Sequence, residues 1–132
     1  MTLEEVQNLM GVALQVKVAV LRGWLEIDLA KECSEPGLFP TGDTLVGTTP
    51  HGTVLRMLPD YSNNLNATQE LKHWLVSEQP DGMIQRFLGH LTTIATKGWV
   101  RPIQACALAS ARQEAQAFVM TMTEVQDEKA NA

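Results

Sequence analysis

One heptad decides how this chain is arranged: Leu58-Pro59-Asp60-Tyr61-Ser62-Asn63-Asn64. Pro59 has no amide proton to give to a sheet, so a strand that arrives from the N-terminal side must end there. The polar residues that follow bond readily to backbone amides in turns and at helix starts. The heptad therefore predicts a junction, with a strand before it and a helix after it.

The residues before the heptad predict a small sheet. Residues 44–48 and 53–58 are rich in β-branched side chains and flank Thr49-Pro50-His51-Gly52, where Pro suits the second turn position and Gly the fourth. These two runs predict a hairpin. Residues 25–29 alternate apolar and acidic side chains, as in a strand with one face in water. Residues 30–43 are rich in Glu, Ser, Pro and Gly, which predicts a long surface loop.

The N-terminal segment predicts a helix. Thr2 and Glu5 have the spacing of a capping box, and apolar residues follow at helical intervals. We expect one helix from residue 2 or 3 to about Arg22, with Gly23 just past its end. A strand that starts at Leu14 is the alternative, because alternate residues from there are also apolar.

The residues after the heptad predict three more helices. The first starts near Asn66, which repeats the capping pattern with Gln69, and ends near Ser77. Apolar spacing alone predicts a helix over 83–95. The last helix opens at Pro102, which suits the first helical turn, and a short extended piece at Trp99-Val100 precedes it.

Together these segments predict an α+β fold in which a small antiparallel sheet of about three strands packs against three to four helices. The chain has 132 residues, which fits one domain, and we place that domain at 1–126 with a flexible polar tail at 127–132. Only three Phe, one Tyr and three Trp are present, so the core should be mainly aliphatic. For the three Trp we expect core positions.

The net charge of −5, with basic residues scattered one at a time, argues against duplex nucleic acid as a partner. We expect a soluble, cytoplasmic protein without a membrane partner, because no leader pattern and no long uncharged stretch is present. Cys33 and Cys106 lie far apart, and the three His are dispersed, so neither a disulfide nor a metal site is expected. No cofactor motif is present either.

Three stretches together carry a resemblance to a known family: Arg22-Gly23-Trp24, the heptad at 58–64, and residues 101–109, which read Arg-Pro-Ile-Gln-Ala-Cys-Ala-Leu-Ala. In this order they resemble the phage ABA sandwich domain proteins, small phage and prophage proteins of undefined role. The resemblance implies no catalytic residues. The chain departs from that family at 83–95, where the family typically has paired strands, and at 30–43, which looks like an insertion.

The heptad also supplies the candidate ligand site. Tyr61, Asn63 and Asn64 stand near a predicted helix start, where free amides attract anions, and Arg56 lies on the adjacent strand. With Arg101 they form our candidate set for a small anionic, phosphate-bearing ligand. The alternative, which we favour, is that Asp60 and Asn63 cap backbone amides while Tyr61 packs on the core.

The leading functional hypothesis is a non-catalytic phage or prophage accessory protein that acts by binding. It would counter a host defence by sequestering a nucleotide-type signal or by occluding a host protein, in the host cytoplasm. The alternatives are a small hydrolase or transferase with a site near Asp60-Tyr61, and a structural or assembly component of the phage particle. For the alanine and methionine face of the last helix we expect core packing, with a self-association surface as the alternative. We also expect a homo-oligomer, because a small chain gains stability by dimerising.

Overall fold

The fold is α+β, as the sequence predicts. The computed structural model describes residues 2–29, 45–50, 52, 54–95 and 109–131. Within them the chain forms five helices and a three-stranded antiparallel sheet. The elements in order are α1 (Leu3–Gln7), α2 (Gly11–Arg22), β1 (Leu25–Leu29), β2 (Leu45–Thr48), β3 (Leu55–Met57), α3 (Leu65–Ser77), α4 (Met83–Ala95) and α6 (Ala111–Ala130).

The sheet has the order β1-β2-β3, and both strand pairs are antiparallel. Gly47 in the central strand lies opposite Arg56 in β3. The predicted hairpin is confirmed, because the Thr49 amide donates to the Val54 carbonyl at 3.2 Å and the Gly52 amide donates to the Thr49 carbonyl at 3.3 Å. The register of β1 against β2 shifts between Leu25 and Asp28, which marks a β-bulge in the edge strand.

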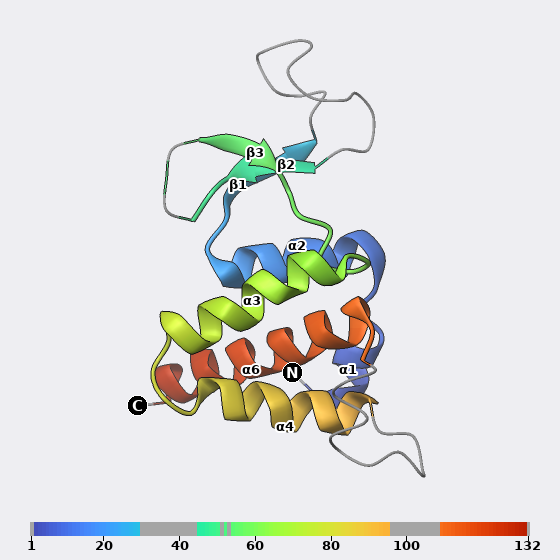
Figure 1. Cartoon of the computed structure of the whole chain (residues 1–132), viewed down its shortest axis with the longest axis vertical. Coiled ribbons are helices and arrows are strands. Elements are labelled where there is room, and N and C mark those ends of the chain that lie inside the picture. The colour runs from blue at the N-terminus through green and yellow to red at the C-terminus, as the bar shows by residue number, and fades with distance from the viewer. Residues whose placement is uncertain (1, 30–44, 51, 53, 96–108, 132) are drawn as a thin grey trace.

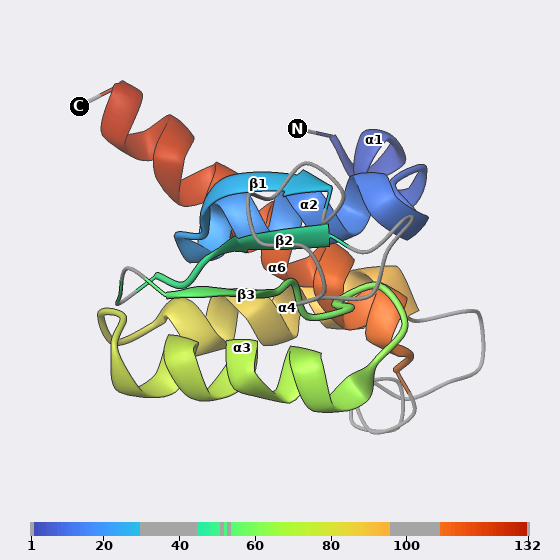
Figure 2. The same cartoon turned by 90° about the horizontal axis from the view of Figure 1, so that it is seen from above.

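The sheet lies on one side of the helices (Figure 1). Helices α2 and α3 are next to it, and α4 lies on the far side of the molecule. The view from above shows β1 over α2 and places α6 between the other helices (Figure 2). No helix in the described part of the chain is both long and apolar enough to cross a bilayer.

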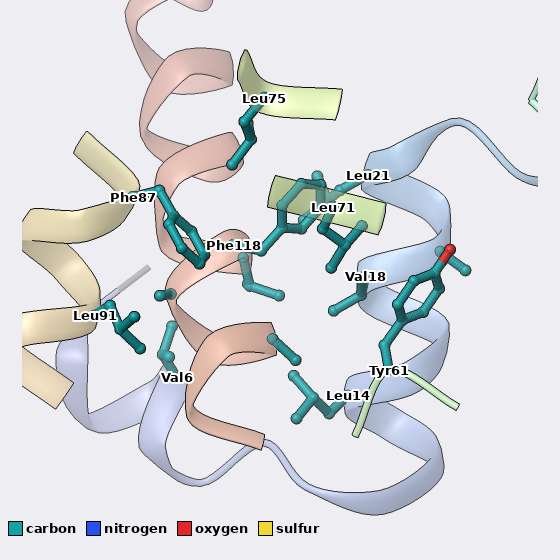
Figure 3. Close-up of a cluster of buried hydrophobic side chains, with 14 of the residues drawn as sticks. Val6, Leu14, Val18, Leu21, Tyr61, Leu71, Leu75, Phe87, Leu91 and Phe118 are labelled. Atoms are coloured by element: carbon teal, nitrogen blue, oxygen red, sulfur yellow. The ribbon is translucent and has the colours of Figure 1, made fainter. Parts of the chain in front are cut away.

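The core is centred on α6. Its Ala115, Ala117, Phe118 and Val119 side chains have no exposed surface. Figure 3 shows Phe118 within a cluster of apolar side chains from the surrounding helices. The alanine face of this helix is therefore packed inside the molecule, as we expect, and its alternative role as a self-association surface is wrong for these residues.

The prediction of a single N-terminal helix is wrong. The chain leaves the helix after Gln7 and starts a second helix at Gly11, whose φ is +58°. The buried Gln116 side chain donates from Nε2 to the Leu9 carbonyl at 2.9 Å and to the Gln7 carbonyl at 3.4 Å. These bonds satisfy backbone groups at the break, so the turn is stabilised by a residue of α6. The alternative strand from Leu14 is not formed either, since Leu14 lies in α2.

The last helix begins later than predicted. Ser110 has extended backbone angles, and its side chain forms a capping box with Gln113, so helix α6 starts at Ala111. The prediction of a continuous helix from Pro102 is therefore wrong. The helix continues to Ala130, so residues 127–130, which we assigned to a polar tail, are helical and exposed.

The middle helices follow the prediction closely. Helix α4 covers Met83–Ala95, the range that the apolar spacing indicates. Helix α3 ends at Ser77 as expected, but Asn64 rather than Asn66 caps its start. The predicted loop at 30–43, the extended piece at 99–100 and the residues Arg101 and Pro102 lie outside the described residues.

Candidate functional site

The heptad forms a tight turn between β3 and α3. The Asp60 carboxylate accepts from the Ser62 hydroxyl at 2.8 Å and from the Asn63 amide group at 3.4 Å. The Asn64 amide donates to the Asp60 carbonyl at 2.9 Å, and the Asn64 side chain accepts from the Asn66 amide at 2.8 Å. Each of these polar side chains therefore stabilises the turn or the helix start.

Helix α2 holds the start of this turn in place. Gln15 Nε2 donates to the Pro59 carbonyl at 3.0 Å and to the Leu58 carbonyl at 3.3 Å. Both carbonyls lie beyond the end of β3, and the Pro59 carbonyl also accepts from the Tyr61 amide at 3.0 Å, so the glutamine adds to the bonds that satisfy them. The turn is thereby fixed against α2, and Tyr61 is brought to the same helix.

Tyr61 is the most deeply placed residue of the heptad, with 1% of its surface exposed. Its ring lies beside α2, and its hydroxyl is at the rim of the buried cluster (Figure 3). Burial raises the pKa of Tyr61 from 10.0 to about 12, and the negative charge of Glu70 adds to this effect, while a hydrogen bond from the Trp24 indole opposes it. The phenol therefore stays protonated and can donate a hydrogen bond throughout the physiological range.

An ion pair between a buried arginine and a half-exposed glutamate lies close to this phenol. Arg22, in the last turn of α2, is 8% exposed, and its Nη2 is 2.9 Å from Oε1 of Glu70 on α3. Its Nε donates to the same oxygen at 3.0 Å. The guanidinium carbon is 4.6 Å from the centre of the Trp74 ring, which places the cation on an aromatic face. Glu70 is half-exposed, so one side of the pair faces solvent.

These side chains surround a cavity of about 340 Å³ between α2, α3 and the hairpin turn. The walls are mostly apolar, and the described lining residues with polar side chains are Arg22, Glu70, Tyr61 and Thr49. The described lining residues are Arg22, Trp24, Thr49, Pro50, Pro59, Tyr61, Ala67 and Glu70. The volume falls within the range of small-molecule sites, and a few polar groups in an apolar cavity are typical of such sites.

Of our candidate set, this cavity contains Tyr61 alone. Arg56 is exposed on β3, and Asn63 and Asn64 are exposed in the turn; none of the three lines the cavity. Arg101 lies outside the described residues. The structure does not bring Arg56 and the asparagines together at this cavity.

The partners of Tyr61 cannot be identified from the sequence. The sequence predicts Arg22 at the end of a helix and Trp24 in the core, and no pattern in it singles out Glu70. Glu70 lies 48 positions from Arg22, and no local pattern links the two. The stretch Arg22-Gly23-Trp24 was nevertheless one of the three that carry the family resemblance.

The described residues hold no other site with clear chemistry. No group of three or more His, Cys, Asp or Glu side chains within them is placed to hold a metal ion. His90 Nε2 lies 2.9 Å from Glu124 on the surface between α4 and α6. Asp60, the proposed residue of a hydrolase site, is occupied within its turn and does not line the cavity.

Comparison of the whole chain with protein-family models, with curated proteins and with solved structures finds no match.

Proposed function

We propose that this chain is a non-catalytic binding protein of a phage or prophage, which counters a host defence by sequestering a nucleotide-type signal. The resemblance of its three short stretches to the phage ABA sandwich domain proteins supports the phage assignment. The cavity around Arg22, Tyr61 and Glu70 supports the binding role. The carrying observation is that a mostly apolar cavity brings a carboxylate, a guanidinium and a neutral phenol together.

This arrangement suits the base of a nucleotide better than its phosphate. The charge of Arg22 is balanced by Glu70, so the cavity has no uncompensated cation among its described residues. A phosphate there would have to displace the carboxylate. A heterocyclic base instead offers neutral donors and acceptors, which match the Glu70 carboxylate and the Tyr61 hydroxyl. Pro50, Pro59 and Trp24 supply apolar surface for the ring faces.

The test is binding by the purified full chain. Native mass spectrometry of protein recovered from defence-expressing cells should show a retained nucleotide, and a panel of nucleosides and nucleotides should raise the melting temperature. Nucleosides that share the base should give a shift as well, because the base makes the main contacts. A chain that retains no small molecule and shows no shift with any member of the panel rules the proposal out.

A matched pair of variants places the ligand in the cavity. Glu70→Gln should weaken binding of a nucleoside by about tenfold or more, because a charge-assisted hydrogen bond contributes about 1.5–3 kcal/mol. A nucleoside is the probe because it carries no phosphate that the Arg22 charge, left without its carboxylate partner, could attract. Glu128→Gln is the control, since Glu128 is also an exposed glutamate paired with an arginine, at 2.7 Å from Arg86, but lies on α6 outside the cavity. Equal affinities for the two variants contradict the assignment of the site.

Occlusion of a host protein is the second candidate function, and one observation favours it. An apolar groove between α2 and β1, which also has Trp24 in its wall, is exposed to solvent, and its apolar lining suits a protein segment.

A further inference from the structure

A second concave surface lies between α2 and β1 and is distinct from the cavity described above. Its volume is about 490 Å³. The described residues that line it are Val16, Val20, Trp24, Leu25, Glu26, Ile27, Asp28 and Leu45. We call it the α2–β1 groove. Trp24 is the one residue common to the groove and the cavity among those described.

The groove exposes apolar side chains that a folded chain normally covers. Val20 is 55% exposed and Leu25 is 62% exposed, and both line the groove. Val12 is 60% exposed and precedes Val16 and Val20 at intervals of four residues, so the three valines follow one face of α2. A continuous apolar stripe beside a strand is typical of a protein interaction surface.

Glu26 gives this surface a charge and a second distinguishing feature. It is the only residue other than glycine with positive φ in the described part of the chain, at +54°, and it sits in the bulge of β1. The Thr48 hydroxyl donates to its carboxylate at the long distance of 3.4 Å, and the side chain is exposed. Strained backbone at a bulge re-aims a side chain, and here it keeps a carboxylate at the groove.

Charge distinguishes between the possible occupants. In an antiparallel pairing of β1 with β1 of a second copy, centred on Ile27, Glu26 would lie opposite Asp28. Like charges opposite each other destabilise strand pairs, and the net charge of −5 adds to the repulsion between copies. A segment that carries a lysine or arginine would instead meet Glu26 with a favourable charge.

We propose that the α2–β1 groove binds a segment of a partner protein that has several apolar side chains and one basic side chain, with the basic group against Glu26. The apolar side chains cover the valine stripe and Leu25. This inference does not depend on the nucleotide-binding proposal, because the groove and the cavity have different described lining residues apart from Trp24.

The experiment is a selection of random displayed peptides on the full-length chain, followed by affinity measurement of the enriched sequences. Enriched peptides should combine apolar residues with a lysine or arginine. Val20→Glu should weaken their binding by about tenfold or more, because the variant places a charge in the apolar contact. Val76→Glu is the matched control, since Val76 is 65% exposed but lies on α3 outside the groove.

A charge exchange tests the role of Glu26. Selection on Glu26→Lys should enrich peptides that carry aspartate or glutamate in place of the basic residue. Thermal unfolding of each variant checks that it folds, and Leu25→Ser serves in place of Val20→Glu if the latter does not.

Four outcomes overturn the proposal. In the first, the selection enriches no peptide, and in the second, both groove variants leave binding of the enriched peptides unchanged. In the third, selection on Glu26→Lys enriches basic peptides as strongly as selection on the wild-type chain does. In the fourth, the wild-type chain forms a dimer that Val20→Glu dissociates. The last outcome would assign the groove to a second copy.

Discussion

Glu26 shows how one residue links the local backbone to the shape of a surface. A residue with a side chain in the left-handed region costs about 1–2 kcal/mol relative to its usual conformation, whereas glycine adopts that region freely. Its φ of +54° is imposed by the bulge of β1 against β2. The folded protein therefore carries strain at the edge of the α2–β1 groove.

Glu26→Gly should release this strain. We expect the free energy of unfolding to rise by roughly 0.5–1 kcal/mol, because the gain from unstrained φ exceeds the added entropy of the unfolded chain. Urea unfolding followed by circular dichroism measures the change. Glu26→Ala is the control and should bring no gain, since alanine has the same φ penalty. A glycine variant no more stable than the alanine variant would show that the positive φ is not a source of strain.

Tyr61 predicts a dependence of stability on alkaline pH. Its pKa in the folded protein is raised from 10.0 to about 12, mainly by burial, so the folded state keeps its proton where the unfolded state loses it. The contribution is fully present below pH 10 and is lost as the pH rises toward 12, over which the free energy of unfolding should fall by roughly 2–3 kcal/mol.

Because the chain has one tyrosine, tyrosinate absorbance reports on this group directly. Tyr61→Phe should lose the part of the alkaline dependence that Tyr61 contributes. A wild-type tyrosine that ionises near pH 10 in the folded state would contradict the burial of its hydroxyl.

At the scale of elements, the start of α6 depends on one cap. The Ser110 hydroxyl accepts from the Gln113 amide at 3.2 Å, and the Gln113 side chain accepts from the Ser110 amide at 2.9 Å. Ser110→Ala should lower the free energy of unfolding by about 1 kcal/mol, and Ser110→Asp should restore most of the loss. Chemical unfolding of the two variants gives the comparison. Equal losses in both would mean that packing, not capping, sets the helix start.

Helices α3 and α6 are joined by a buried carboxylate. Glu114 is 4% exposed and accepts from the Thr68 hydroxyl at 2.7 Å and from Lys72 Nζ at 3.1 Å. Lys72→Met should destabilise the protein by about 1–3 kcal/mol, since it leaves the carboxylate with an unmet interaction. Adding Glu114→Gln should recover part of that loss, because the amide has no charge to compensate.

Denaturant unfolding of the two single variants and the double variant measures this coupling. Lys129→Met is the control, because Lys129 is exposed near the end of α6 and should change stability little. Additive effects of the Lys72 and Glu114 changes would exclude a coupled pair.

The elements also show which parts of the fold the sequence can predict. The hairpin, β1 and α4 follow from turn chemistry and from periodicity, which are properties of neighbouring residues. The break between α1 and α2 does not, because Gln116 satisfies its carbonyls from 109 and 107 positions away. The late start of α6 has a signal in the sequence, since Ser110 and Gln113 stand at capping-box spacing, but the prediction of a helix from Pro102 does not use it. Of the residues at the cavity, Tyr61 could be predicted from the sequence. Glu70 could not, because only the folded structure brings α3 next to the end of α2.

At the scale of the whole molecule, the helices hold the main core and the sheet rests on it. Side chains of α6 such as Phe118 and Val119 are completely buried in the main cluster. Of the described strand side chains, Ile27 and Leu45 pack against that cluster, and both are only partly buried. The sheet therefore shares less apolar surface with the core than α6 does, which predicts that the two parts differ in local stability.

Hydrogen exchange as a function of urea tests this difference. Amides of Ala115 to Val119 should exchange only through global unfolding, with the free energy and urea dependence of the whole chain. Amides of Val46 and Gly47, although they lie in the central strand, should exchange at a lower free energy and with a weaker urea dependence, because separating the sheet exposes less surface. Trp24 would lose its neighbours from the sheet in that opening, so both the cavity and the groove should open with it. If strand and helix amides instead share one free energy and one urea dependence, the sheet and the helices unfold as a single unit, and ligands at either site would have to stabilise the entire chain.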